Sequence, residues 1–399
     1  MKKRNICYVL MALLLCMTGC ETKQSLAQVD TVDPAVLADP NAFNHLASRD
    51  WDATPSVFWF DEETGVSYFI NRASDYYIYQ LEGNEAKLVV DIPAQELWMH
   101  DGLLYFMVEN YDNRELVDIH LGDIYCYNPK EDMVELVYAV GAMDEKGAGH
   151  ELKVNENGIY FSYLVKDEER STATSSRFTP YYYHLPFGAT EPVKDELEMT
   201  MVGWENYELL CMPPWTLVSR TEGLKDKKEL SINAFQYCIV GDMLYSIGLG
   251  DCKLHGLNLR TEEKIEYDFS EIFQASDYVT GERIIPSGLV VFNSFVIKEN
   301  EIWLSGTSRL YHMNLETGEQ NSYILKYEDK EEFDNGVTMR NLYTAGNELY
   351  IEVRPAGQAQ FNPSYELVRV VTDKMELSDY TVNGYHETFM IVEEVTKMQ

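Results

Sequence analysis

The 399-residue chain has little positive charge, few cysteines and no histidine spacing that suits a metal. Lys and Arg number 32 against 66 Asp and Glu, which gives a formal net charge of −34. A field of that sign repels DNA and RNA, so a nucleic-acid partner is excluded. None of the eight His occurs as HxH or HExxH and no CxxC is present, so no zinc site is predicted. The acidity is typical of a solvated surface on an exported protein, with Ca²⁺ or a cationic partner as the alternative.

Beyond the start of the chain, no stretch approaches roughly 18 consecutive apolar residues, so no transmembrane helix is predicted there. The start has the three-part layout of a secretory signal. Lys2, Lys3 and Arg4 precede an apolar run over residues 6–17, and a polar stretch follows. That run has about a dozen residues, whereas roughly 20 are needed to span a bilayer. We therefore expect a targeting segment, not a permanent transmembrane helix.

The stretch "MTGC" at residues 17–20 resembles the lipobox of bacterial lipoproteins, although Met17 stands where Leu is usual. The resemblance implies lipidation of Cys20 and cleavage on its amino side, so that residues 1–19 are a signal peptide and residues 20–50 a tether. It also implies an extracytoplasmic protein, lipid-anchored to the bacterial membrane. More than one lipid chain gives stable attachment, since each buried CH₂ contributes on the order of 0.8 kcal/mol. The alternative is an ordinary signal peptide with a chance Cys.

Four cysteines remain beyond the lipobox, at Cys126, Cys211, Cys238 and Cys252. Four cysteines allow three pairings. The first three lie in apolar, strand-like runs, where a thiol packs as a small hydrophobic group. We expect these cysteines to be mostly buried and outside disulfides, and whether any of them pair stays open.

From Trp51 onward the chain is rich in aromatic and β-branched residues, including most of its 28 Tyr, and turn signals break it about every 8–12 residues. One unit recurs: an apolar strand, a tight turn, and a strand that carries an aromatic residue. The first and last aromatic markers are 282 residues apart over six steps, a mean of 47. One four-stranded propeller blade has about that length. We therefore predict an all-β fold, a single β-propeller over residues 51–399 with about seven blades, six or eight being alternatives. The markers are Tyr68, Tyr105, Tyr160, Tyr207, Tyr245, Trp303 and Tyr350.

A second unit, a strand, a polar turn and another strand, follows most markers, as in "YYYHLPFGATEPVK" and "RLYHMNLETGE". These hairpins are similar to the third and fourth strands of TolB-like and low-density-lipoprotein-receptor-like propellers, including bacterial extracytoplasmic propeller domains of unknown function. The likeness covers most of the chain after Trp51 and consists of strand pattern and turns. Neither a full YWTD motif nor a WD40 signature is present.

Catalytic signatures are absent as well. The chain has no GxSxG, no P-loop, no complete GxGxxG and no SxDxGxTW box of the sialidase type. These absences disfavour an enzyme without excluding one, because a propeller active site is assembled from separate blades.

Two aromatic groups are candidate ligand-binding residues. Trp98 and His100, in "WMHDG", place an indole and an imidazole beside a carboxylate, or form an outer-strand Trp next to a hairpin turn. Tyr181 and Tyr183, in "TPYYYHLPFG", have rings that can stack on sugars. Strand alternation alone also accounts for the two Tyr as core and face residues.

An acidic cluster in "DNRELVDIHLGD" makes Asp112, Asp118 and Asp123 candidate metal ligands. The spacing lacks the DxDxDG pattern of known Ca²⁺ loops. We therefore predict no cofactor, with Ca²⁺ as the alternative.

Three segments depart from the repeat. Pro213 and Pro214 break a strand of the fourth blade, because consecutive Pro residues cannot sit in a central ladder. Residues 268–294 form an insertion between the fifth and sixth blades. Loops on a rigid scaffold carry binding surfaces, although both segments also suit plain connections. The stretch from Tyr385 is expected to form one more strand, which would close the ring against the first blade.

The sequence therefore predicts a membrane-anchored extracytoplasmic lipoprotein whose propeller is a non-enzymatic binding or scaffolding module for a protein or glycan of the cell envelope. The alternative is an extracytoplasmic carbohydrate-active propeller enzyme, a hydrolase or a lyase. Acids and a His converging at one mouth of the channel would favour the enzyme. An aromatic groove without such a titrating pair would favour the binding module.

Overall fold

The structure is a computed structural model, and it describes the chain in seventeen stretches. They are residues 57–109, 122–140, 147–155, 157–166, 178–195, 203–204, 207–210, 215–219, 227–230, 232, 234, 236–248, 252–272, 292–327, 337–355, 365–382 and 385–398. Every regular element in these stretches is a β-strand, which confirms the predicted all-β fold. The described stretches hold no helix long and apolar enough to cross a membrane. The predicted boundaries at residues 19 and 50 lie outside them.

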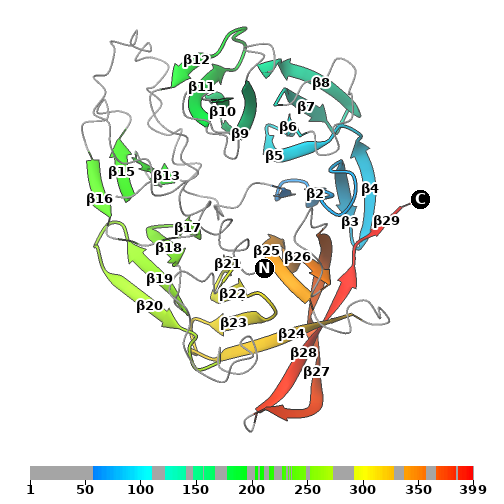
Figure 1. Cartoon of the computed structure of the whole chain (residues 1–399), viewed down its shortest axis with the longest axis vertical. Coiled ribbons are helices and arrows are strands. Elements are labelled where there is room, and N and C mark those ends of the chain that lie inside the picture. The colour runs from blue at the N-terminus through cyan, green and yellow to red at the C-terminus, as the bar shows by residue number, and fades with distance from the viewer. Residues whose placement is uncertain are drawn as a thin grey trace, which may run out of the picture.

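The described strands form six sheets, one of which holds eight strands, and together they make up seven four-stranded antiparallel units around a common centre (Figure 1). Unit 1 holds β1 (Phe58–Asp61), β2 (Val66–Ile70), β3 (Ile78–Glu82) and β4 (Glu85–Val90). Unit 2 holds β5 (Ala94–His100), β6 (Leu103–Val108), β7 (Ile124–Asn128) and β8 (Met133–Tyr138). Unit 3 holds β9 (Gly147–Asn155), β10 (Gly158–Lys166), β11 (Phe178–Pro186) and β12 (Val193–Asp195). Unit 4 holds β13 (Gly203–Trp204), β14 (Tyr207–Leu210), β15 (Trp215–Ser219) and β16 (Lys227–Leu230).

The remaining strands follow the same plan. Unit 5 holds β17 (Gln236–Val240), β18 (Met243–Ile247), β19 (Lys253–Asn258) and β20 (Lys264–Asp268). Unit 6 holds β21 (Ser294–Lys298), β22 (Glu301–Ser305), β23 (Leu310–Asn314) and β24 (Gln320–Tyr327). Unit 7 holds β25 (Val337–Ala345), β26 (Glu348–Pro355), β27 (Glu366–Val382) and β28 (Tyr385–Glu394), and β29 (Thr396–Lys397) follows it. First strands lie near the centre and fourth strands at the outside (Figure 1).

The aromatic markers of the sequence repeat each lie on the second strand of a unit. Second strands are covered on both faces by neighbouring units, so they are continuously apolar. In β6, Leu104 and Phe106 are fully buried. Outer strands have one face in water, and Leu136 on β8 is 51% exposed. The repeat of aromatic markers in the sequence therefore follows from the packing of neighbouring units against the second strands.

The ring is closed by backbone pairing at the C-terminus. Unit 1 lies beside unit 7, because β1 contacts β25 as well as β5. The stretch from Tyr385 does not close the ring against unit 1 as expected: β28 completes unit 7 and pairs in parallel with β24 of unit 6. The two-residue β29 makes the parallel pairing with β4 of unit 1 instead.

A side-chain contact supports this closure. The Nζ of Lys397 on β29 donates to Asp75 Oδ2 at 3.0 Å and to Ser74 Oγ at 2.7 Å. Burial acts to raise the pKa of Asp75, but hydrogen bonds from Lys397 and from the Tyr79 hydroxyl outweigh it, and the pKa is lowered. The carboxylate of Asp75 therefore remains charged to hold the end of the chain.

The two ends of the units differ. Antiparallel order places the turns between first and second and between third and fourth strands at one end, which we call the turn end. The other connections leave from the opposite end, which we call the loop end. At the loop end β6 ends at Val108 and β7 begins at Ile124, and β20 ends at Asp268 and β21 begins at Ser294. The two longest connections between the described strands therefore leave from one face.

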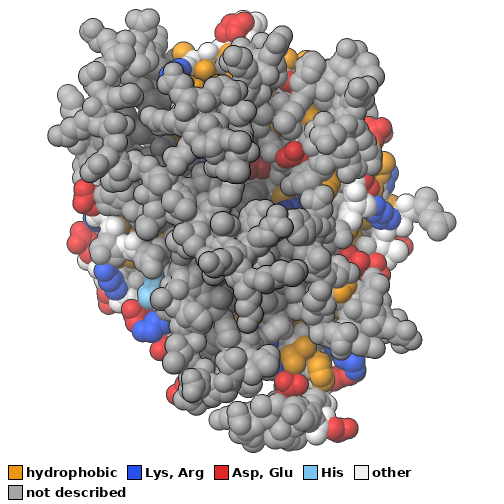
Figure 2. All heavy atoms as spheres, in the orientation of Figure 1, with side chains coloured by type: hydrophobic (Ala, Val, Ile, Leu, Met, Phe, Trp, Pro, Cys, Tyr) orange, Lys and Arg blue, Asp and Glu red, His pale blue; other side chains and the backbone are white. Residues whose placement is uncertain are grey.

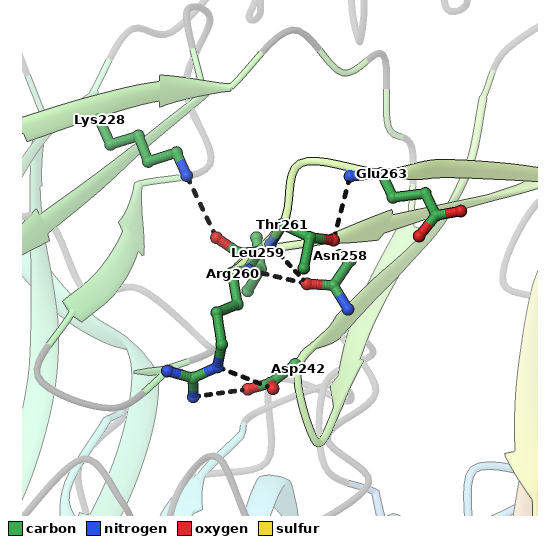
Figure 3. Close-up of polar contacts among 7 residues, drawn as sticks. All are labelled: Lys228, Asp242, Asn258, Leu259, Arg260, Thr261 and Glu263. Atoms are coloured by element: carbon green, nitrogen blue, oxygen red, sulfur yellow. Dashed lines mark hydrogen bonds and ion pairs between the residues drawn. The ribbon is translucent and has the colours of Figure 1, made fainter.

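The turn end is fixed by a repeated Asx turn in units 5 and 6. The Oδ1 of Asn258 accepts hydrogen bonds from the backbone N–H groups of Arg260 and Thr261 at 2.9 and 2.8 Å (Figure 3). Asn314 does the same one unit later, at 3.0 and 2.9 Å. Both turns have the sequence N-L-x-T-x-E. Asn favours such turns because its side chain replaces a backbone acceptor.

The unit 5 turn also joins neighbouring elements (Figure 3). The Nζ of Lys228, on β16 of unit 4, donates to the carbonyl of Leu259 at 3.1 Å. The guanidinium of Arg260 forms two hydrogen bonds with Asp242, at 3.0 and 3.1 Å. The turn end is thus held by short, satisfied polar contacts.

Candidate functional site

A pocket lies at the loop end between unit 7 and unit 1, and we call it the junction pocket. Its empty volume is about 240 Å³, which includes space open to solvent. Its apolar lining comes from Val57, Phe58, Phe69, Ile70 and Leu367. Its polar lining comes from Asn71, Arg72, Tyr343, Glu352 and Tyr365. The pocket therefore combines aromatic walls with charged groups.

A β-bulge shapes the unit 7 side of this pocket. The register between β25 and β26 shifts between Met339 and Leu342, so two residues of β25, Arg340 and Asn341, stand opposite one residue of β26, Glu352. Unit 6 satisfies the backbone of the bulge: Ser305 Oγ donates to the Arg340 carbonyl at 2.7 Å, and the Leu342 N–H donates to Ser294 Oγ at 3.2 Å. The bulge is thus a defined feature that re-aims side chains.

Glu352 is the buried carboxylate of the pocket. It is 4% exposed, and its Oε2 accepts hydrogen bonds from Asn341 Nδ2 at 2.8 Å and from the Tyr343 hydroxyl at 3.2 Å. Its Oε1 lies 3.5 Å from Nη1 of Arg72, which comes from the connection between β2 and β3 in unit 1. The carboxylate is therefore fully engaged, and it spans the junction between the last and first units.

Two further cations lie beside the pocket, around Tyr365. The Cζ atoms of Arg340 and Arg354 lie 5.2 and 5.3 Å from the centroid of the Tyr365 ring. Arg354 is 9% exposed, and its Nε and Nη1 have no hydrogen-bond partner among the described residues. Cation–π contacts of this kind are modest in strength.

The local charge is opposite to that of the chain. The guanidinium of Arg72 lies beside the carboxylate of Glu352, and those of Arg340 and Arg354 lie at the Tyr365 ring, in a protein whose net charge is −34. Figure 2 shows one face of the molecule, and acidic side chains are visible at several places around its periphery. The junction is thus a cationic site in an acidic molecule.

The structure places Trp98 and His100 on β5, away from this pocket. Trp98 is on a first strand, not an outer one, is 1% exposed, and packs on Trp59 with ring centroids 5.5 Å apart. His100 is at the turn end, where its ring stacks on Phe187 at 5.2 Å and its Nε2 lies 3.6 Å from a carboxylate oxygen of Asp101. The indole is therefore a core group, and ligand binding by His100 stays a prediction.

Tyr181 and Tyr183 lie on β11 of unit 3, the unit next to Trp98 and His100. Tyr183 stacks on Phe161 at 5.5 Å, and the Nζ of Lys194 lies 4.8 Å from the centroid of the Tyr181 ring. Burial, followed by the neighbouring Tyr181, raises the pKa of Tyr183. Both rings are only half-buried, so sugar binding here stays a prediction.

The predicted metal site is not covered by the structure. Asp112 and Asp118 lie outside the described residues, and Asp123 is 1% exposed. Within the described stretches, no group of three or more His, Cys, Asp and Glu side chains is placed to hold a metal. Ca²⁺ binding therefore stays a prediction.

Several other predicted features also fall outside the described residues, namely Cys20, Cys211, Pro213, Pro214 and most of the insertion. Among the described cysteines, Cys126, Cys238 and Cys252 form no disulfide. Burial, followed by the charge of Glu135, raises the pKa of the Cys126 thiol. A thiol with a raised pKa is a poor nucleophile, which agrees with a packing role for Cys126.

Sequence reasoning missed the junction pocket, because its residues come from opposite ends of the chain and share no local motif. Arg72 and Glu352 are 280 residues apart. The one local signal is charge: residues 355–364, which follow Arg354, contain no Asp or Glu.

Comparison with known proteins gives structural likeness only. No model of a known protein family matches the sequence, and no curated protein matches it. A luciferin-regenerating enzyme is similar in structure at 11% identity, covering 90% of this chain and 98% of its own, with a TM-score of 0.36. A calcium-binding protein, regucalcin, from Agrobacterium tumefaciens has 11% identity, 77% and 85% coverage and a TM-score of 0.32. Apo AztD from Citrobacter koseri has 12% identity, 67% and 70% coverage and a TM-score of 0.31. These values carry no argument about activity, and the fold rests on the sheets described above.

Proposed function

We propose that the chain is an extracytoplasmic lipoprotein, anchored by a lipid on Cys20, whose propeller binds an envelope ligand without transforming it. The observation that carries the binding role is the junction pocket, where aromatic walls meet Arg72 and where two more cations, Arg340 and Arg354, lie around the lining residue Tyr365. Small-molecule sites combine apolar lining with a few placed polar groups in this way. Residues 20–50 would reach on the order of 100 Å if fully extended, so the propeller stays near the membrane.

The enzymatic alternative, a carbohydrate-active hydrolase or lyase, needs an acid poised for proton transfer beside the ligand. The pocket carboxylate, Glu352, is instead held by Asn341, Tyr343 and Arg72. Its neighbours therefore suit a structural or positioning role for Glu352.

The anchor is tested by changing Cys20 to Ser in the full chain expressed in a bacterial host. We expect the wild-type protein in the membrane fraction, extracted only by detergent, because the lipid holds it there. We expect the Cys20→Ser variant either unprocessed or released into the soluble fraction. Unchanged processing and membrane retention of Cys20→Ser would contradict the anchor.

The binding role is tested by screening the purified full chain against cell-wall glycans, other polysaccharides, envelope peptides and Ca²⁺. We expect at least one ligand to raise the melting temperature, because a ligand that binds only the folded state stabilises it. Product analysis runs in parallel on every ligand. Cleavage of a glycan would replace the binding module with the enzymatic alternative.

A further inference from the structure

Arg354 is a buried cation, and two of its three guanidinium nitrogens make no hydrogen bond among the described residues. It is 9% exposed, and its Nε and Nη1 have no partner among the described residues. Removing a charged donor from water without giving it an acceptor is costly, so proteins rarely retain such a group without a use for it. The stacking of Arg354 on Tyr365 offsets only a small part of that cost.

Arg340 brings a second charge to the same ring. Its Cζ lies 5.2 Å from the Tyr365 centroid, so two like charges share one aromatic group and repel each other. Elsewhere in the described residues, arginines are paired: Arg260 with Asp242 and Arg309 with Glu387. The pair at Tyr365 is therefore exceptional in a chain with twice as many acids as bases.

Among the residues that the structure describes, the ion pairs join neither Arg340 nor Arg354 to an acid. The ten residues after Arg354 read PAGQAQFNPS and contain no acid. Glu352 is already bonded to Asn341 and Tyr343. Glu366 follows Tyr365 directly on the chain, and side chains alternate along a strand, so it points to the opposite face of the sheet.

We infer that Arg340 and Arg354, which lie around Tyr365 at the edge of the junction pocket, receive an oxyanion, a carboxylate or a phosphate group carried by the ligand. Planar guanidinium groups match the oxygens of carboxylates and phosphates. The inference rests on the proposed binding function and adds the chemical class of the ligand.

The test uses the full chain with three probes at fixed ionic strength: sodium galacturonate, inorganic phosphate and uncharged galactose. We expect galacturonate or phosphate to raise the melting temperature by several degrees, and galactose to have no effect. The two anions distinguish a carboxylate ligand from a phosphate ligand. A shift with both anions that persists in Arg354→Met would mark an adventitious ion only and overturn the inference.

Variants locate the effect. Arg354→Met and Arg340→Met are each expected to bind the active anion at least tenfold more weakly. Arg260→Met removes an ion-paired arginine at the turn end, and its affinity is expected to equal that of the wild type. If Arg354→Met fails to fold, Arg354→Lys keeps the charge without the planar donors, and its affinity is also expected to fall at least tenfold.

The outcomes separate the two proposals. If no anion shifts the wild type but a neutral glycan does, the binding function stands and the oxyanion inference fails. If an anionic glycan binds and is cleaved, the oxyanion inference stands and the non-enzymatic function fails. If neither an anion nor a glycan binds, both fail.

Discussion

Replacing Trp98 with Ala will lower the free energy of unfolding by about 3–5 kcal/mol, the range for large aromatic deletions in a core. Trp98 is 1% exposed and belongs to a cluster that includes Met107, Ile124 and Phe161 of units 2 and 3. Its ring also packs on Trp59 of unit 1. Its removal leaves a cavity that neighbouring strands cannot fill without breaking their ladders. The effect is large because the side chain lies where neighbouring units pack against each other.

This prediction is checked by urea unfolding, followed by far-ultraviolet circular dichroism so that the lost indole does not alter the signal. Phe187→Ala is the matched control: Phe187 stacks on the other predicted ligand residue, His100, but is 43% exposed. We expect Phe187→Ala to cost less than about 1 kcal/mol. Unchanged stability of Trp98→Ala together with lost ligand binding would instead support the ligand role predicted from the sequence.

Replacing Glu96 with Gln will stabilise the protein at pH 8 and flatten its pH dependence. Burial, partly offset by the hydrogen bond from the Leu152 N–H at 2.7 Å, raises the pKa of Glu96 from 4.5 to about 8. Leu152 belongs to the next unit, so Glu96 connects units 2 and 3. Ser294 makes the equivalent contact between units 6 and 7, with the Leu342 N–H. Glu96 therefore accepts a hydrogen bond between units as Ser294 does, but its carboxyl group can also ionise.

The sign follows from proton binding. Between pH 4.5 and about 8 the folded state keeps a proton that the unfolded state releases, so stability falls as pH rises through that window and levels off above it. Gln keeps a side-chain oxygen that can accept the hydrogen bond from the Leu152 N–H, and it has no carboxyl group to titrate. We expect little difference between Glu96→Gln and wild type at pH 4.5, and an advantage of roughly 2–4 kcal/mol for the variant at pH 8.

Urea unfolding at a series of pH values checks this prediction. Ser294→Ala serves as the control, because it removes the equivalent hydrogen bond without removing an ionisable group. We expect Ser294→Ala to cost about 1 kcal/mol at every pH. A parallel pH profile for wild type and Glu96→Gln would show that Glu96 ionises normally in the folded state.

The propeller could be predicted because its strands and turns are local patterns. Tyr68 and Tyr350, the first and last markers along the chain, both lie on second strands, where burial on two faces requires apolar and aromatic residues. The closing strand could not be placed in the same way. Only two residues, Thr396 and Lys397, pair with β4, and a two-residue strand has no periodicity to detect.

The site could not be predicted, because its chemistry depends on contacts between distant residues. Nothing in the sequence around Arg354 shows that its guanidinium is buried or that Arg340 lies on the same ring. The bulge that carries Arg340 depends on Ser294 and Ser305 of another unit. By contrast, "WMHDG" has a local pattern that suggested a binding group, and burial by neighbouring units makes Trp98 part of the core.

The most direct test of the account is a calorimetric titration of the full chain, wild type and Arg354→Met, with sodium galacturonate and with inorganic phosphate. The account predicts saturable binding of at least one anion by the wild type, with affinity at least tenfold weaker in Arg354→Met. Absence of heat from both anions, or equal affinity in the two proteins, would contradict an oxyanion site between units 7 and 1.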